Sequence, residues 1–169
     1  MEKLDNRLLN SDDVNLLFSY NSSIENLAFV PRTPFKSNEG AEMLYAKFTA
    51  SMKEQTSVWW AFQDKKTGHT VGYGGLFGID KESNRAEIGY GLLKEFWGKG
   101  FASSIVCNIL NYGFLELKLH RIFSLVDPEN KASVRVLEKN GFNLEGIMHD
   151  YFYARGRYFD MCLMAKINR

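Results

Sequence analysis

A turn that contains Gly98 and Gly100 is the part of the sequence best suited to hold a charged ligand. Alternating residues up to Leu92 predict a strand before it, and the apolar residues after Phe101 predict a helix. Glycine has no side chain, so the backbone can turn sharply there and approach a ligand closely. The amides from Gly98 to Ala102 would be unpaired donors at the start of the helix, which favours an anion such as a phosphate. The alternative is a tight strand-to-helix turn that binds nothing.

Two common phosphate-binding motifs do not describe this turn. A P-loop requires the pattern G-x-x-x-x-G-K-S/T, and a dinucleotide-binding turn requires G-x-G-x-x-G with an acidic residue about 20 positions later. In this sequence Ser103 stands at the position of the third glycine, and the next acidic residue is Glu116. Neither motif therefore accounts for the turn.

The sequence from Glu87 to the C-terminus resembles the GNAT superfamily of acetyl-CoA-dependent N-acetyltransferases. The pyrophosphate motif of that family, Q/R-x-x-G-x-G/A, is matched by EFWGKG at residues 95–100, and the segments LHRI, DPENKAS and EKNGF follow in the family's order. The WGKG form and the pair Asn130 and Ser133 resemble the branch of ribosomal-protein amino-terminal acetyltransferases and spermidine acetyltransferases. Glu95 departs from the Gln or Arg of the family, which is tolerable because the family binds the anion mainly through backbone amides.

The resemblance implies an α/β fold of the α+β type, with helices flanking a mixed, mostly antiparallel sheet of about seven strands. Two parallel strands of such a sheet splay apart, and acetyl-CoA enters the gap. A β-bulge beside Gly89 and Gly91 would suit that arrangement. On this basis the residues expected to bind acetyl-CoA are Tyr90, Gly91, Leu92, Trp97, Gly98, Lys99, Gly100, Phe101, Ala102 and Asn130.

The chemistry implied by the resemblance is attack of an amine on a thioester, which requires a base for the amine. Glu87 is the candidate, because alternation along its strand places it on the same face as Gly89 and Gly91. Partial burial of a carboxylate there would raise its pKa towards a range useful for a base. In the alternative, Glu87 pairs with a cation such as Arg85 or Arg121 and only holds the sheet together.

The departing thiolate needs a hydrogen-bond donor or a proton. Many members of the family use a tyrosine in the helix after the Asn motif, but Leu137 occupies that position here. Ser133 follows Asn130 by one helical turn, so both side chains can face one ligand. The resemblance implies that Asn130 binds the pantetheine amide and that Ser133 is the acid, with helix capping as its alternative role. A coenzyme A thiolate hardly needs a strong acid if its pKa is about 8.5, the value for cysteine.

Length and charge narrow the class of protein. The 169 residues predict a single domain over residues 1–169, and 21 basic against 20 acidic residues give a net charge of +1. This balance gives no reason to expect nucleic acid or an acidic membrane surface as a partner. The charged N-terminal residues and the lack of a long apolar run predict a cytoplasmic protein without a signal peptide or membrane span.

Cysteine and histidine give no sign of a metal or redox site. Cys107 and Cys162 are predicted to be buried thiols, one on an apolar helix face and one in an apolar strand. The three histidines are scattered along the chain, so we expect no metal ion. Acetyl-CoA is therefore the only cosubstrate expected besides the acceptor.

The remaining pattern predicts the elements that position these residues. Strands are expected through Glu87 and at residues 3–9, 58–63, 70–78, 119–126, 142–153 and 158–167. Helices are expected after residue 11 and over residues 37–54, 101–115 and 130–140. The third of these has no charged residue over residues 101–115 and is predicted to be buried on more than one face. Two prolines within residues 29–35 predict a mobile loop.

The resemblance places the acceptor between this loop and the last hairpin, so Arg32, Tyr151 and Tyr153 are candidates to contact it. We expect direct transfer to a primary amine, with a protein amino terminus, notably that of a ribosomal protein, as the acceptor. A polyamine of the spermidine type is ranked second, because the chain has no excess of acidic residues to hold a polycation. A small-molecule or antibiotic amine is a further alternative. A non-catalytic acyl-CoA sensor is the alternative from another class, and a monomer or homodimer is expected.

Overall fold

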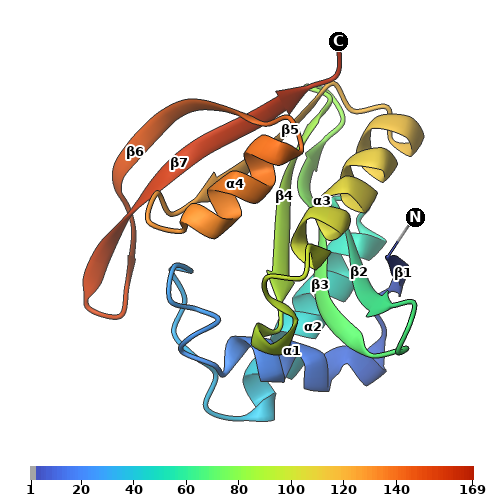
Figure 1. The fold of residues 1–169 in the computed structure, drawn as a ribbon, viewed down its shortest axis with the longest axis vertical. Coiled ribbons are helices and arrows are strands. Elements are labelled where there is room, and N and C mark those ends of the chain that lie inside the picture. The colour runs from blue at the N-terminus through green and yellow to red at the C-terminus, as the bar shows by residue number, and fades with distance from the viewer. Residues whose placement is uncertain (1–2) are drawn as a thin grey trace.

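The computed structural model describes residues 3–169, and its centre is a seven-stranded sheet (Figure 1). The strand order is β1-β2-β3-β4-β5-β7-β6, and β4 and β5 form its one parallel pair. This is the mixed, mostly antiparallel sheet that the sequence predicts. The strands are β1 (Leu4–Leu8), β2 (Ser57–Asp64), β3 (Thr70–Asp80), β4 (Arg85–Leu92), β5 (Arg121–Val126), β6 (Asn143–Ala154) and β7 (Arg157–Ile167).

Helices cover both faces of the sheet. They are α1 (Val14–Asn21), α2 (Asn38–Lys53), α3 (Phe101–Asn111) and α4 (Lys131–Lys139), with short 3-10 turns at Ser11–Asp13 and Lys94–Phe96. Alternation along β2 divides the core between the faces, because Trp60 and Phe62 pack with α3 while Trp59 and Ala61 pack with α1 and α2. In Figure 1, α3 and α4 lie on the near side of the sheet, and the β6–β7 hairpin extends beyond the helical layers.

The β4–β5 pair opens soon after it begins. Parallel pairing runs only from Arg85 opposite Arg121 to Glu87 opposite Phe123, although β4 continues to Leu92 and β5 to Val126. The two strands therefore splay apart beyond Glu87, as the resemblance implies.

The bulge expected beside Gly89 and Gly91 is not present. The β3–β4 register continues without a shift through both glycines, and its irregularity lies between Phe77 and Asp80. The two positions serve close packing instead. A Cβ added to Gly91 would lie 2.7 Å from the Tyr20 ring, and one added to Gly89 would lie 3.0 Å from the Phe77 ring. A prediction based only on glycine in a strand cannot separate these two uses.

The helix α3 is buried on one broad face, not on several. Phe101, Ile105 and Ile109 are buried along it at helical spacing. Cys107 falls on the opposite side and is exposed, so the prediction of a buried thiol is wrong for Cys107, whereas Cys162 is buried as predicted. The residues after Asn111 form a π-helical turn that reaches Glu116.

The two residues just before the predicted mobile loop of residues 29–35 are bonded to the last hairpin. Arg155 donates to the carbonyls of Leu27 at 2.7 Å and Ala28 at 3.2 Å, and Arg157 donates to that of Ala28 at 3.3 Å. Both guanidinium groups also lie over the Phe159 ring. The turn of the β6–β7 hairpin and the α1–α2 connection are therefore held against each other.

Candidate acetyl-CoA and acetyl-transfer site

The glycine turn has the conformation that an anion cradle requires. Gly98 and Gly100 have φ angles of +72° and +81°, in the left-handed region that other residues rarely adopt. Gly100 is the N-cap residue of α3, and no side chain caps this helix start. A Cβ added to Gly98 would have nothing within 4 Å. Free amides around open space fit a pyrophosphate group, so these residues can hold that part of acetyl-CoA.

A lysine from the other end of the chain lies beside the cradle. Lys3 donates from Nζ to the carbonyl of Lys99 at 3.2 Å, and the same nitrogen is 3.4 Å from a Cβ added to Gly100. Lys99 turns back to the carbonyl of Glu95 at 2.8 Å. Sequence reasoning missed Lys3 because no motif connects residues that are 96 positions apart.

Trp97 fixes the turn to the end of β4. Its indole Nε1 donates to the carbonyl of Leu92 at 2.8 Å, while the ring remains half exposed. Two groups expected to bind the same cofactor are thus held together: the strand end at Leu92 and the turn at Gly98. Phe101 is buried in the core cluster beside them, and Ala102 packs against that cluster.

Glu87 lies where the parallel pairing ends, and burial raises the pKa of its carboxyl to about 7. A hydrogen bond from the backbone of Leu125, on the strand that splays away, opposes part of that rise in pKa. The ion pair expected in the structural alternative is not formed with either arginine, because Arg85 pairs with Asp80 and Arg121 pairs with Glu145. Within residues 3–169 the Glu87 carboxylate has no ion-pair partner, so its negative charge is uncompensated.

Asn130 and Ser133 meet as the spacing predicts, but in a different way. The Asn130 side chain caps α4 by accepting from the backbone amide of Ser133 at 3.1 Å. The hydroxyl of Ser133 turns to the hydroxyl of Tyr90, 2.7 Å away. Leu137 is fully buried in the core. The sequence predicted Tyr90 to bind acetyl-CoA, but nothing in it indicated that the phenol would meet Ser133.

The three acceptor candidates are not brought together. Arg32 donates to the side chain of Asn21 and contacts the hydroxyl of Tyr73, inside the α1–α2 layer. Tyr151 and Tyr153 are exposed on β6. The structure therefore places Arg32 in the α1–α2 layer and the two tyrosines on the hairpin, and each contacts other residues.

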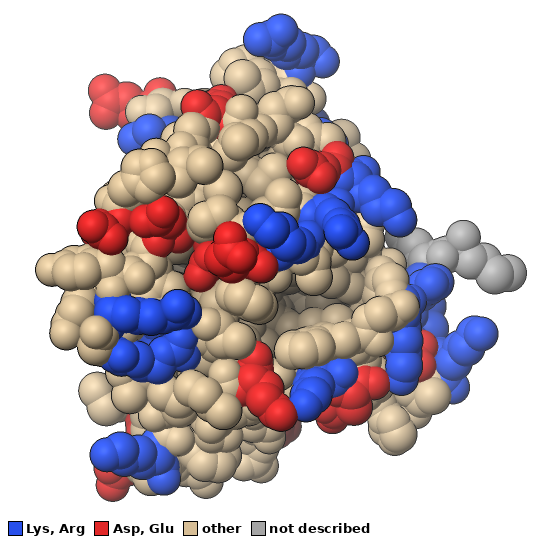
Figure 2. Space-filling view, turned by 60° about the vertical axis from the view of Figure 1, so that its left-hand side comes forward, with Lys and Arg blue, Asp and Glu red and all other residues tan. Residues whose placement is uncertain are grey.

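Charge on the hairpin side of the molecule is mixed. Figure 2 shows acidic and basic side chains interspersed around a hollow near the middle of this face. One hollow of about 280 Å³ lies between Asp127–Glu129, just after β5, and Arg157–Asp160 at the start of β7. Its charged lining residues are the acidic Asp127, Glu129 and Asp160 and the basic Arg157.

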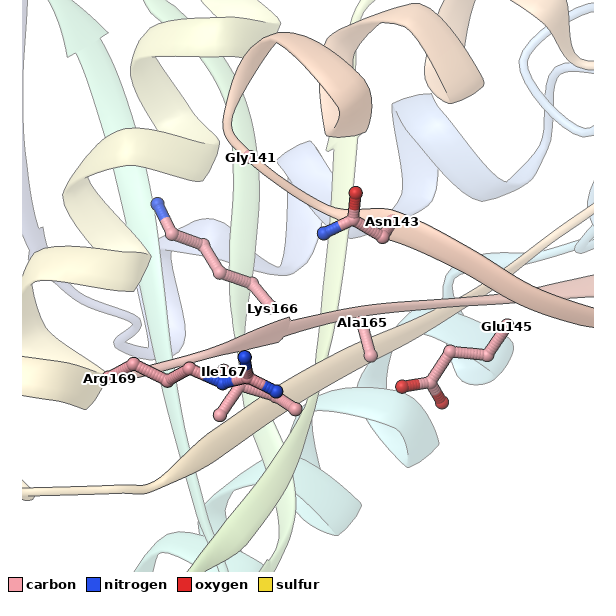
Figure 3. A pocket seen from close by; sticks show the side chains of 7 residues that line it. All are labelled: Gly141, Asn143, Glu145, Ala165, Lys166, Ile167 and Arg169. Atoms are coloured by element: carbon pink, nitrogen blue, oxygen red, sulfur yellow. The ribbon is translucent and has the colours of Figure 1, made fainter.

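A larger hollow of about 390 Å³ lies far from these residues, between the start of β6 and the end of β7 (Figure 3). Two of its charged groups, Lys166 and Glu145, already have partners. Lys166 extends away from Glu145 and donates to the carbonyl of Asn140 at 2.8 Å, and Glu145 pairs with Arg121. This hollow therefore offers no free charge for catalysis or for anion binding by these two residues.

The described residues, 3–169, contain neither a metal-binding cluster nor a membrane-spanning helix. No group of three His, Cys, Asp or Glu side chains in that range is arranged to hold a metal ion. No helix there is both long and apolar enough to cross a membrane.

Comparison with known proteins decides the family. A family model described as an acetyltransferase (GNAT) domain matches residues 4–143. The chain belongs to the GNAT acetyltransferase family. Its function is therefore acetyl transfer, and the resemblance seen in the glycine turn and in the Asn130–Ser133 segment is confirmed at the level of the family.

Relatives within the GNAT family cover most of the chain. An uncharacterised N-acetyltransferase of Bacillus licheniformis is 35% identical over 169 residues, which is 99% of this chain and 94% of that protein. The crystal structure of a Vibrio cholerae spermidine N-acetyltransferase in complex with CoA and spermine superposes with a TM-score of 0.88 at 27% identity, covering 99% of this chain and 96% of that one. A putative ribosomal N-acetyltransferase of Bacillus subtilis is 33% identical over 102 residues, 60% of this chain and 56% of that protein.

Gly100→Val tests the cradle, with Gly68→Val as its matched control. Gly68 has a φ of +70° in the β2–β3 turn, and a Cβ added to it would have nothing within 4 Å. Both variants should lose about 1–2 kcal/mol of stability from backbone strain. Only Gly100→Val should also lose CoA affinity, by about tenfold or more, because the branched side chain obstructs the anion. Calorimetric titration of both folded variants measures this, and equal affinities would contradict the cradle.

Glu87→Gln should alter how stability depends on pH. The folded pKa of about 7 lies above the usual glutamate pKa of 4.5, so the wild type loses stability as pH rises from about 4.5 to about 7. Glu87→Gln does not ionise, so its stability relative to wild type should increase across that range, by no more than about 3 kcal/mol. Urea denaturation at pH 5 and pH 8 measures the difference. A difference that does not change with pH would show that the Glu87 pKa is not raised.

Proposed function

We propose that this GNAT acetyltransferase transfers acetyl directly from acetyl-CoA to the primary amine of an aliphatic polyammonium compound of the spermidine type. The cradle at Gly98 and Gly100 would hold the pyrophosphate, and the splayed strands would hold the thioester arm. Glu87 would accept the proton of the amine as it attacks.

The observation that carries the proposal is the state of Glu87. A carboxylate without an ion pair, with a pKa of about 7, is charged just above neutral pH and available to an ammonium group. An alkyl amine with a pKa of about 10.4 is less than about 0.1% free base at pH 7, whereas an α-amine with a pKa of about 7.7–8.0 is already about a tenth free base. A tuned base therefore benefits an alkyl amine far more than a protein amino terminus.

The charge near Glu87 also supports a cationic acceptor. Leu125, whose backbone bonds the Glu87 carboxylate, lies two residues before Asp127, or about 7 Å along an extended chain. Asp127 lines the smaller hollow, together with the acidic residues Glu129 and Asp160. The net charge of +1 led the sequence analysis to rank a polyamine below a protein amino terminus, but the local charge favours the polyamine.

The relatives agree with this order of acceptors. Spermidine N(1)-acetyltransferase of Vibrio cholerae aligns with 92% of this chain, whereas the putative ribosomal N-acetyltransferase of Bacillus subtilis aligns with 60%. A protein amino terminus is the second candidate, because the sequence shares the WGKG form and the Asn130–Ser133 pair with that branch.

An amine panel with detection of released coenzyme A tests the acceptor. We expect turnover with spermidine to exceed that with alanyl or seryl peptides. Glu129→Gln and Asp160→Asn should each raise the KM for spermidine about twofold to fivefold, as expected for single exposed charges. Glu82→Gln, in the β3–β4 turn, is the matched control and should leave KM unchanged. Turnover on peptides with none on spermidine would reverse the order, and none on any amine would favour an acyl-CoA sensor.

The pH profile tests the role of Glu87. With spermidine at pH 7, Glu87→Gln should lower kcat/KM by about 100-fold or more, the usual contribution of a positioned base. Activity should recover towards wild type near pH 10, where the amine loses its proton to water. A wild-type kcat/KM at neutral pH in this variant, with CoA affinity intact, would exclude Glu87 as the base.

A further inference from the structure

Two hydroxyl groups from separate elements meet on the α3–α4 side of the sheet. Tyr90, on β4, and Ser133, in the first turn of α4, are 2.7 Å apart through their oxygens, and both are partly buried. Ser133 is also held from behind, because its amide donates to the Asn130 side chain. The backbone that carries the Ser133 hydroxyl is therefore held in place, and the hydroxyl has a defined hydrogen-bond partner.

The pair spans the opening in the sheet. Tyr90 lies three residues beyond Glu87, where β4 no longer pairs with β5. Alternation puts Tyr90 on the face opposite Glu87, and a Cβ added to neighbouring Gly74 would lie 3.0 Å from the Tyr90 Cβ and 2.9 Å from Ile109 of α3. The contact thus bridges β4 and α4 on the side away from the proposed base.

Either hydroxyl of the pair can donate to the other. Burial raises the pKa of Tyr90 to about 12, so its phenol keeps its hydrogen at any pH at which the enzyme works. The phenol can then donate to the Ser133 oxygen, which leaves the Ser133 hydrogen free to point elsewhere. Hydrogen bonds in such a chain polarise one another and strengthen the last donor.

Resting on the proposed function, and on the role at the leaving sulfur that the family resemblance implies for Ser133, we propose that Tyr90 is a positioning residue: it orients and polarises the Ser133 hydroxyl so that Ser133 donates to the sulfur of coenzyme A as it leaves. The amine nitrogen bonds to the acetyl carbon, the carbon–sulfur bond breaks, and its electron pair stays on sulfur. The amine proton passes to Glu87 and then to solvent, and the thiolate later takes a proton from solvent. Tyr90 gives up no proton, so it is a positioning residue, and Ser133 supplies the function for which the family uses a tyrosine at the position of Leu137.

The test measures the thiol of bound coenzyme A and needs no acceptor. Thiolate absorbance is titrated for coenzyme A bound to wild type, Ser133→Ala, Tyr90→Phe and the double variant, with desulfo-coenzyme A complexes as baselines. Ser133→Ala keeps the amide that caps α4, and Tyr90→Phe keeps the ring, so both should fold. Tyr112→Phe is the matched control, since Tyr112 packs on Trp60 outside the pair.

The proposal makes an ordered set of expectations. The ionisation constant of the bound thiol should fall about tenfold in Ser133→Ala and about threefold in Tyr90→Phe. The double variant should match Ser133→Ala, because Tyr90 acts only through Ser133, and Tyr112→Phe should match wild type. In single-turnover reactions with spermidine, the rate constant for acetyl transfer should fall more in Ser133→Ala than in Tyr90→Phe. The affinity for acetyl-CoA should be unchanged in both variants.

Three results would overturn the proposal. A Tyr90→Phe complex that titrates like wild type would reduce the tyrosine to packing, and additive effects in the double variant would show that it does not act through Ser133. A Ser133→Ala complex that titrates like wild type would leave Ser133 as a capping residue. A different result would contradict the proposed function: the wild type would bind coenzyme A normally but would acetylate no amine. Wild type that does not bind coenzyme A would overturn both.

Discussion

The early end of pairing between β4 and β5 is the constraint on which the site depends. Only three residues of β4 are paired with β5. On the edges that face each other, the backbones beyond Glu87 and Phe123 must therefore satisfy their polar groups elsewhere. On the Leu125 side that need is met by the Glu87 carboxylate. The same divergence makes room for a ligand and keeps a carboxyl group half buried without a cation, so the opening and the proposed base have a single structural cause.

Each face of the opening has its own chemistry. On one side, Glu87 lies in the layer formed with α1 and α2, and on the other, Tyr90 reaches Ser133 of α4. A strand alternates its side chains, so neighbouring residues of β4 serve the two sides without any change of backbone. In the proposed mechanism, proton acceptance by Glu87 and thiolate stabilisation by Ser133 are thereby kept apart, so that a buried carboxylate would not face a developing thiolate directly.

The sequence predicted what local patterns encode. Periodicity located the strands and helices to within a few residues, and the glycine turn with its motif indicated the family, since both depend on residues close together in the chain. It could not predict contacts across long separations, such as Lys3 beside the cradle or Tyr90 with Ser133. It also could not assign Gly89 and Gly91 to ring packing, because the rings of Phe77 and Tyr20 come from other elements. Whole-chain charge does not report the charges within one hollow, which is why the proposed acceptor differs from the one that the net charge favours.

The position of β7 between β5 and β6 has a consequence for synthesis on the ribosome. The strand β7 follows both β5 and β6 in the sequence, so it leaves the ribosome after the two strands that it joins. Until it emerges, β5 has only its short parallel contact with β4, and β6 has no partner strand among residues 3–169. The nascent chain must therefore carry an exposed, unfinished edge until β7 is made, which makes this half of the protein the part that most needs protection from aggregation by chaperones.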